Sequence, residues 1–272
     1  SFMKRIRLLV IDPQNDFMDV DGAALPVPGA SADMARLAGF VDTMAAQIDD
    51  IVVTLDSHAS VGIERTSFWL DGQGAPVAPF TPITAAELAA GQYRPRDARR
   101  ADEALAYLKA LEDGGERTLV VWPVHCVLGT WGHNIVPVLA DRIAAWEMAS
   151  GQTCDKVLKG LNPMTEQYSA FRAEVPRADD PRTALNTGLL TRLAGGDALL
   201  VVAGEALSHC VAASGQDMLA GMDATRLRNT VFLTDCMSPV TGFADAATDF
   251  LQQLRAHGVR TQTAQQLADS FS

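Results

Sequence analysis

The sequence has no hydrophobic run long enough to cross a lipid bilayer. Its longest runs, RLLVI near the start and ALLVVAG near residue 200, are much shorter than the roughly 20 apolar residues of a transmembrane helix. Asp12 interrupts the early run, and no small-residue cleavage site follows it, as a signal peptide would require. We therefore expect a cytoplasmic protein with no membrane partner.

Cysteine and basic residues are also scarce. The four cysteines form no CxxC pair and no disulfide framework, so free thiols are expected in a chain of this length without an export signal. There are 22 Lys and Arg against 33 Asp and Glu, which gives a formal net charge of −11. Such a surface repels phosphate backbones, which argues against a nucleic-acid partner.

No linker rich in proline, serine or charge divides the 272 residues, of which 48% are hydrophobic. This composition predicts one large domain with a substantial core. Ser1 and Phe2 precede Met3 and look like the remnant of an expression tag, so we place the domain at 3–272.

Short apolar runs alternate with longer helical stretches along the chain. This alternation predicts a doubly wound α/β/α fold with three layers and a mostly parallel sheet, because strands covered on both faces read as near-continuous apolar runs. The predicted helices lie at about 32–48, 101–112, 133–141, 209–221 and 242–256. The short apolar runs lie at 5–11, 51–55, 118–122, 142–146, 155–160, 199–204, 230–235 and 259–263.

The stretch 65–117 interrupts this alternation. It begins with Phe68 and Trp69, continues through the Gly/Pro-rich segment GQGAPVAPFTPIT, and contains only one helix-like segment. We interpret it as an insertion, because a connection of this length is usually a lid or a substrate loop.

Conspicuous polar residues follow the predicted strands. In a doubly wound fold, ligands bind beyond the carboxyl ends of the strands, so these residues are expected to meet in one crevice. The set consists of Asp12, Asp56, His58, His125, Lys159, Cys210 and Asp235.

Cys210 is the candidate nucleophile. It lies at the start of the helix after the strand 199–204, where free N–H groups and the helix dipole favour a thiolate and can hold an oxyanion. The alternative is a buried structural cysteine, the usual role of a free thiol. His209 beside it is expected to be structural, because neighbouring helical residues point in different directions.

A nucleophilic thiol needs a base and a stabilising charge, and Asp12 and Lys159 are the candidates. Asp12 ends the first strand in VIDPQNDF, and Lys159 ends another in VLKG. Taken alone, Asp12 is equally typical of a turn before proline, and Lys159 could be solvated.

These segments, VIDPQNDF, VLKG and GEALSHCV, resemble the isochorismatase-like cysteine hydrolases and in particular their nicotinamidase branch. The similarity covers nearly the whole chain outside the insertion. It implies that Asp12, Lys159 and Cys210 form a catalytic triad. It also implies an oxyanion hole made by the backbone N–H groups of Ala206 and Cys210, with a cis peptide bond between Glu205 and Ala206.

The same resemblance implies a divalent metal site. Asp56 and His58 face the same side of an extended segment, and His125 follows a later strand. A lone histidine is more often a hydrogen-bonded residue than a ligand, but these three match the metal ligands of nicotinamidases. Glu64 stands where many members have a fourth histidine. We expect zinc, with manganese or iron compatible with the carboxylate, and no organic cofactor.

The expected reaction is hydrolysis of a small-molecule amide of the nicotinamide type through a cysteine thioester, with release of ammonia. Phe17, Trp122, Trp131 and Tyr168 are the candidate pocket residues. Two alternatives stay open: an amidohydrolase of the same family acting on N-carbamoyl or ureido compounds, and a catalytically silent relative that binds a ligand. Members of the family commonly form homo-oligomers, which we expect here by resemblance.

Overall fold

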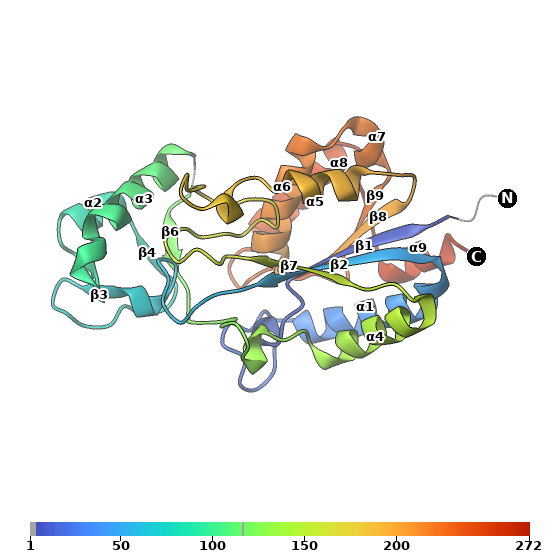
Figure 1. Cartoon of the computed structure of the whole chain (residues 1–272), viewed down its shortest axis with the longest axis horizontal. Coiled ribbons are helices and arrows are strands. Elements are labelled where there is room, and N and C mark those ends of the chain that lie inside the picture. Colours follow the sequence, from blue (N-terminus) through green and yellow to red (C-terminus); the bar gives the residue numbers. More distant parts are fainter. Residues whose placement is uncertain (1–3, 116) are drawn as a thin grey trace.

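Six parallel strands form the centre of the computed structural model, which describes residues 4–115 and 117–272. Their order in the sheet is β10-β9-β8-β1-β2-β7 (Figure 1). The strands are β1 (Ile6–Ile11), β2 (Ile48–Asp56), β7 (Asp155–Lys159), β8 (Leu199–Gly204), β9 (Thr230–Leu233) and β10 (Arg260–Gln262). This arrangement confirms the predicted α/β fold.

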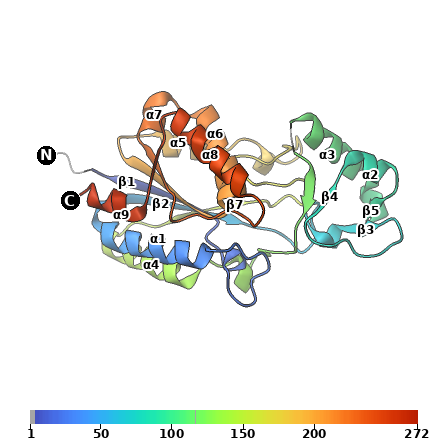
Figure 2. The same ribbon diagram turned by 180° about the vertical axis from the view of Figure 1, so that it is seen from behind.

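Helices cover both faces of the sheet (Figures 1 and 2). On one face lie α1 (Ala30–Met44), α4 (Pro137–Ser150) and α9 (Ala264–Asp269). On the other face lie α5 (Thr187–Ala194), α6 (Ala212–Gly221), α7 (Ala224–Arg228) and α8 (Ala244–Ala256). Because both faces are covered, β1 and β8 are apolar and buried along almost their whole length.

The chain changes direction across the sheet at β1. It passes from β1 to β2 and β7 on one side, and then returns to β8 on the other side. The carboxyl ends of β1, β2, β7 and β8 therefore meet at a topological switch point, where α/β proteins bind their ligands.

Two of the predicted runs do not belong to the central sheet. The run 118–122 contains β6 (Leu119–Val121), which pairs antiparallel with β4 (Thr81–Ile83) in a separate two-stranded sheet. The run 142–146 lies inside α4. Leu139, Ile143 and Trp146 are buried at spacings of four and three residues, which places them on one helical face against the core.

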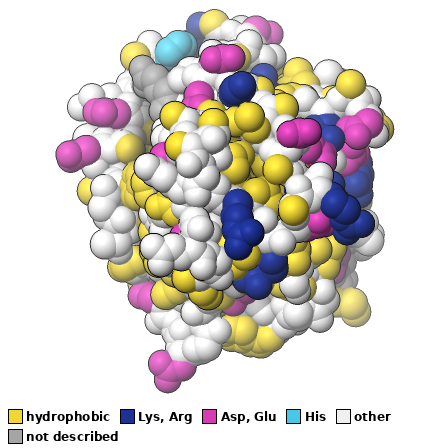
Figure 3. All heavy atoms as spheres, turned by 90° about the vertical axis from the view of Figure 1, so that its left-hand side faces the viewer, with side chains coloured by type: hydrophobic (Ala, Val, Ile, Leu, Met, Phe, Trp, Pro, Cys, Tyr) yellow, Lys and Arg dark blue, Asp and Glu magenta, His cyan; other side chains and the backbone are white. Residues whose placement is uncertain are grey.

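The insertion at 65–117 is more structured than its sequence indicates. It contains β3 (Trp69–Asp71), β5 (Tyr93–Pro95), α2 (Ala85–Ala89) and α3 (Ala101–Asp113), besides β4. Together with β6 they enclose a separate hydrophobic cluster around Trp69. The face toward this end of the molecule carries hydrophobic, basic and acidic side chains side by side (Figure 3).

The extent of the domain, 3–272 with this insertion, stays a prediction. Ser1, Phe2 and Met3, which bear on its start, lie outside the described residues. Among the residues that the structure describes, no helix combines the length and apolar character needed to span a membrane.

Candidate active site

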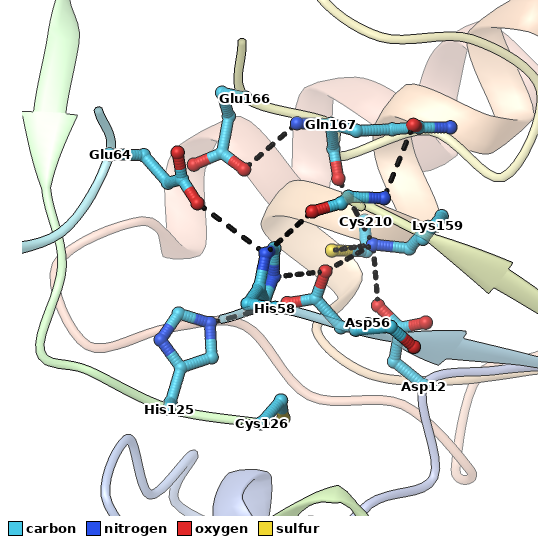
Figure 4. A network of polar contacts seen from close by, with 12 residues as sticks. Asp12, Asp56, His58, Glu64, His125, Cys126, Lys159, Glu166, Gln167 and Cys210 are labelled. Carbon is cyan, nitrogen blue, oxygen red and sulfur yellow. Dashed lines mark hydrogen bonds and ion pairs between the residues drawn. The ribbon is translucent and has the colours of Figure 1, made fainter. Parts of the chain in front are cut away.

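Three predicted site residues meet at the carboxyl edge of the sheet (Figure 4). Asp12 directly follows β1, Lys159 is the last residue of β7, and Cys210 lies in a short π-helical turn, Leu207–Val211, after β8. Lys159 Nζ is 2.9 Å from Asp12 Oδ2 and 3.4 Å from Cys210 Sγ. The sheet therefore brings together three side chains that are remote in sequence.

Lys159 lies at the centre of this cluster, and its side chain is fully buried. Its ammonium group also donates to the Gln167 carbonyl oxygen at 3.1 Å and to Asp56 Oδ1 at 3.2 Å. Burial lowers the pKa of Lys159, but the Asp12 and Asp56 carboxylates raise it by more. The resulting pKa is well above the ordinary value of a lysine. Lys159 is therefore a fixed positive charge between two carboxylates and the thiol.

Asp12 is held in place by Thr54 of β2. The Thr54 hydroxyl donates to Asp12 Oδ1 at 2.7 Å, and the Asp12 N–H donates to the Thr54 carbonyl oxygen at 3.1 Å. Burial raises the pKa of Asp12 above its ordinary 3.8, against the lowering effect of Lys159. A carboxylate with a raised pKa is a stronger proton acceptor than an exposed aspartate.

The structure does not support a resting thiolate at Cys210, which the sequence favoured. Burial raises the pKa of the thiol well above its ordinary value, and the nearby Asp12 and Asp56 carboxylates raise it further, while Lys159 lowers it. Desolvation and negative charge thus outweigh the helix start and the lysine. A neutral thiol beside a carboxylate must lose its proton to that carboxylate before it attacks a substrate.

Asp56, His58 and His125 form a second buried group beside the thiol. One ligand atom from each lies within 4.8 Å of the others. Asp56 Oδ1 is 2.7 Å from His58 Nε2, and Asp56 Oδ2 is 3.2 Å from His125 Nε2. The Gln14 side-chain amide fixes the backbone of Asp56, accepting from its N–H and donating to its carbonyl oxygen, both at 2.8 Å.

The far ring nitrogens of both histidines face carbonyl oxygens. His58 Nδ1 is 3.0 Å from the Gly160 carbonyl oxygen, and His125 Nδ1 is 2.7 Å from that of Pro123. The His58 contact favours a proton on its Nδ1 and turns its Nε2 lone pair toward Asp56. His125 Nδ1 also lies 3.3 Å from Arg65 Nη1, which can only donate, and the contact of His125 Nε2 with Asp56 has hydrogen-bond geometry. The His58 Nε2 contact with Asp56 lacks hydrogen-bond geometry. An imidazole lone pair facing a buried carboxylate fits a cation held between them.

Glu64 lies outside this three-residue group. Its Oε1 is 3.4 Å from His58 Nδ1, the nitrogen that faces away from Asp56, and 3.1 Å from Arg65 Nε. Burial raises the pKa of Glu64 to about 7. In this geometry Glu64 supports the orientation of His58 rather than sharing a ligand position with it.

Four carboxyl groups and two cationic side chains are buried around the site: Asp12, Asp56, Glu64 and Glu166, with Lys159 and Arg65. Burial raises the pKa of Glu64 to about 7 and the pKa of Glu166 well above its ordinary value. A divalent cation bound nearby would favour the ionised forms of both carboxyl groups.

The turn before Cys210 has the backbone that the resemblance implies. The peptide bond between Glu205 and Ala206 is cis, which confirms that expectation. Within residues 4–115 and 117–272 the Ala206 N–H donates to no protein acceptor. It is therefore available to an oxygen atom bound beside Cys210.

A cavity opens beside Cys210, and aromatic rings form much of its wall. Phe17, Trp122 and Tyr168 line it, together with Asp56 and His125 of the candidate metal site. Trp122 Nε1 donates to the Tyr168 hydroxyl at 2.9 Å, which fixes both rings.

Trp131, the fourth predicted pocket residue, lies elsewhere. Its side chain is 49% exposed and does not line the cavity. Asp235 is also remote from the thiol, because its carboxylate caps the start of α9 by accepting the Ala264 N–H at 2.8 Å. Following a strand is therefore not sufficient to place a residue in the site.

His209 is a packing residue at the edge of the cavity. Its ring contacts Trp122, Tyr168 and Phe243, with ring centroids 5.2, 5.6 and 4.6 Å away. Burial lowers its pKa to about 4, so it is neutral at pH 7. It also borders a neighbouring groove of about 780 Å³ beside α6 and α8.

Several residues of the site were not predicted from the sequence. Glu166 lines the cavity, and its backbone N–H donates to the Tyr107 hydroxyl of α3 at 3.0 Å, which connects the insertion to the site. Arg65 is fully buried and donates to the His125 carbonyl oxygen at 2.9 Å. Neither follows a predicted strand, so the rule that identified the triad could not find them.

Comparison with known proteins gives matches over nearly the whole chain. The nicotinamidase of Saccharomyces cerevisiae is 25% identical over 253 residues, covering 93% of this chain and 96% of the relative. No protein-family model matches.

Three solved structures share the fold. The yeast nicotinamidase Pnc1p matches with a TM-score of 0.62 and 22% identity, over 94% of this chain and 99% of that chain. An isochorismatase-like hydrolase from Alkaliphilus metalliredigens gives 0.54 and 17%, over 98% and 100%. The pyrazinamidase of Pyrococcus horikoshii in complex with zinc gives 0.53 and 20%, over 95% and 99%.

The sheet order and the cysteine-centred cluster at its switch point place the chain in the class of α/β folds that these solved structures share. Within that class it is similar to the yeast nicotinamidase over 93% of its length. The comparisons therefore show similarity to nicotinamidases and to isochorismatase-like hydrolases.

Proposed function

We propose that this protein hydrolyses a small-molecule amide through a thioester on Cys210 and releases ammonia. One observation carries the proposal: Lys159 Nζ lies 2.9 Å from the Asp12 carboxylate and 3.4 Å from the Cys210 sulfur, in a buried cluster beside a cavity. This arrangement supplies a nucleophile, a base and a fixed charge, the three parts that covalent catalysis needs.

In the first half of the reaction Asp12 accepts the thiol proton as the sulfur attacks the amide carbonyl carbon. The C=O π electrons move to the oxygen, which becomes the oxyanion of a tetrahedral intermediate. The Ala206 and Cys210 backbone N–H groups stabilise that oxyanion. Asp12 then gives the proton to the nitrogen, the C–N bond breaks, and ammonia leaves a thioester.

In the second half water attacks the thioester while Asp12 accepts one of its protons. The second tetrahedral intermediate collapses, the C–S bond breaks, and the sulfur takes the proton back from Asp12. The net reaction is amide plus water to carboxylic acid plus ammonia. Lys159 keeps the Asp12 carboxylate beside the sulfur and balances negative charge through both halves.

Nicotinamide is the leading substrate. Aromatic rings line the cavity, and the Phe17 ring lies with its centroid 5.5 Å from that of His125. Such a wall suits a flat aromatic amide. An N-carbamoyl amino acid has no flat ring in its reacting group to pack against this wall, which disfavours that class.

For the metal we propose zinc, held by Asp56, His58 and His125, with Glu64 supporting His58. Imidazole and carboxylate donors suit zinc, and they also suit manganese and iron. When bound, the ion would supply a Lewis-acid position for a ring nitrogen of the substrate. Elemental analysis of the purified protein tests its identity. The homo-oligomeric state and cytoplasmic location stay predictions from the sequence.

A panel of amides scored for ammonia tests the function. Nicotinamide, pyrazinamide, benzamide and an N-carbamoyl amino acid are compared, with wild type and Cys210→Ala assayed in parallel. We expect ammonia from the aromatic amides and a loss of several orders of magnitude in the variant. If no compound releases ammonia the enzyme proposal is wrong, and turnover that survives in Cys210→Ala would exclude the thioester.

A further inference from the structure

One residue of the chain, Ser238, contacts both ends of the turn Glu205–Leu207. The Ser238 N–H donates to Glu205 Oε1 at 3.0 Å, and the Ser238 carbonyl oxygen accepts the Leu207 N–H at 2.8 Å. Ala206 lines the cavity and lies between these two contacts, and its N–H donates to no acceptor among the described residues. The orientation of that N–H therefore depends on how firmly the two ends are held.

Ser238 is itself tied to helix α1. Its hydroxyl donates to Asp33 Oδ2 at 2.6 Å, and Arg36 donates to the other Asp33 oxygen at 3.1 Å. Arg36 Nε also donates to the Asp235 carbonyl oxygen at 2.6 Å, on the same loop after β9. The loop that holds the turn is thus fixed from α1 rather than only by its own backbone.

Glu205 is a buried acid that the proposed reaction does not use. Its side chain is fully enclosed and does not line the cavity. Burial raises its pKa well above its ordinary value, and the neighbouring Asp33 carboxylate raises it further. Burying such a polar group is costly unless it makes a needed hydrogen bond, and Glu205 makes one to Ser238.

We propose that Glu205 is a positioning residue for the oxyanion hole: with Ser238 it holds the turn so that the Ala206 N–H points at the oxygen formed beside Cys210. This inference rests on the proposed hydrolase function. We expect Glu205 to affect mainly the stability of the transition state. A tetrahedral oxyanion depends more strictly on the position of the Ala206 N–H than the ground-state amide does.

The test compares two substitutions of nearly the same size. Glu205→Leu removes the acceptor for the Ser238 N–H, and Glu205→Gln keeps an acceptor oxygen. For the leucine variant we expect kcat to fall about 10- to 100-fold with KM within about threefold. This is less than the ~10²–10³-fold loss from removing an oxyanion donor outright. The glutamine variant should recover most of kcat.

A second measurement reads the oxyanion hole directly. The aldehyde analogue of the best amide forms a tetrahedral adduct with the thiol, whereas the product acid does not. In Glu205→Leu the aldehyde should bind more weakly by the same factor as kcat falls, and the acid should bind as it does to wild type. A structural role alone would weaken both ligands or neither.

The inference is overturned if Glu205→Leu keeps the wild-type kcat, or if KM rises while kcat and aldehyde affinity stay constant. Should that variant fail to fold, Ser238→Ala decides, because it removes only the hydroxyl contact to Asp33. We expect about a 3- to 10-fold lower kcat in Ser238→Ala at constant KM, and an unchanged kcat would refute the proposal. An inactive wild type would instead refute the hydrolase function itself.

Discussion

Lys159 Nζ and the sulfur of Cys210 lie 3.4 Å apart although the two residues are 51 positions apart in the sequence. The same ammonium group contacts the Asp12 and Asp56 carboxylates, and nothing of it reaches solvent. A charge in this position acts on both folding and reaction, because its loss leaves two buried carboxylates without their nearest cation.

Lys159→Met should therefore destabilise the protein and impair catalysis. Removing one partner of a buried ion pair costs about 3–5 kcal/mol, and we expect a decrease of that size in the free energy of unfolding, measured with urea. Lys156→Met is the matched control, because Lys156 is exposed on the same strand and should change stability by less than about 0.5 kcal/mol. Equal effects of the two substitutions would contradict the role given to Lys159.

Asp12 should set the acid side of the pH profile. The reaction needs the ionised carboxylate, so kcat/KM should rise with pH through the pKa of Asp12. Because burial raises that pKa, the midpoint of the rise should lie above 3.8. Asp12→Asn should lower kcat by about 10²–10⁴-fold, the usual contribution of a general base. A profile of kcat/KM against pH, recorded with saturating metal, measures the midpoint.

His209 provides the control for that profile, since its pKa of about 4 could produce an acid limb of its own. In His209→Phe the limb should remain, because the ring only packs against Trp122, Tyr168 and Phe243. Disappearance of the limb in this variant would transfer the role of base from Asp12 to His209.

The triad could be predicted from the sequence because it follows a general rule of the fold. Asp12 follows β1, Lys159 ends β7, and Cys210 lies in the turn after β8, so the carboxyl edge of a parallel sheet gathers them. The rule failed for Asp235, because the end of β9 lies beyond β8, away from β1, β2 and β7. There the carboxylate caps α9 instead.

Other features depended on contacts that no local pattern encodes. Arg65 and Glu166 come from loops, and only tertiary packing brings them to His125 and the cavity. The prediction of a resting thiolate at Cys210 was wrong for a related reason. The helix start is visible in the sequence, whereas the burial and the carboxylates that raise the pKa of the thiol are not.

Gly160 should be required for the metal site. It has a φ of +80°, and a Cβ placed on it would lie 2.4 Å from His58 Cε1. Gly160→Ala should therefore displace His58 and weaken zinc binding by at least about tenfold, as loss of a supporting contact does. Gly151→Ala is the control, with a φ of +71° and no atom within 4 Å of the added carbon. Zinc affinity is measured by competition with a chromogenic chelator, and equal affinities in the two variants would show that His58 is not displaced.

Cys210 should react with small electrophiles faster than the other thiols, although its own pKa is raised. Asp12 can accept its proton as the carbon–sulfur bond forms, and Lys159 balances the charge that develops. Cys154 is equally buried, its pKa is raised to about 11, and its sulfur donates to the Asp155 carbonyl oxygen at 3.7 Å. We expect iodoacetamide to modify Cys210 at least about tenfold faster than Cys154, as followed by mass spectrometry of peptides at pH 7.

In Asp12→Asn the rate at Cys210 should fall toward that of Cys154, because a buried thiol without its base has no route to the thiolate. If Cys210 kept its full rate in that variant, the proton would leave by another path and Asp12 would lose its part in forming the nucleophile.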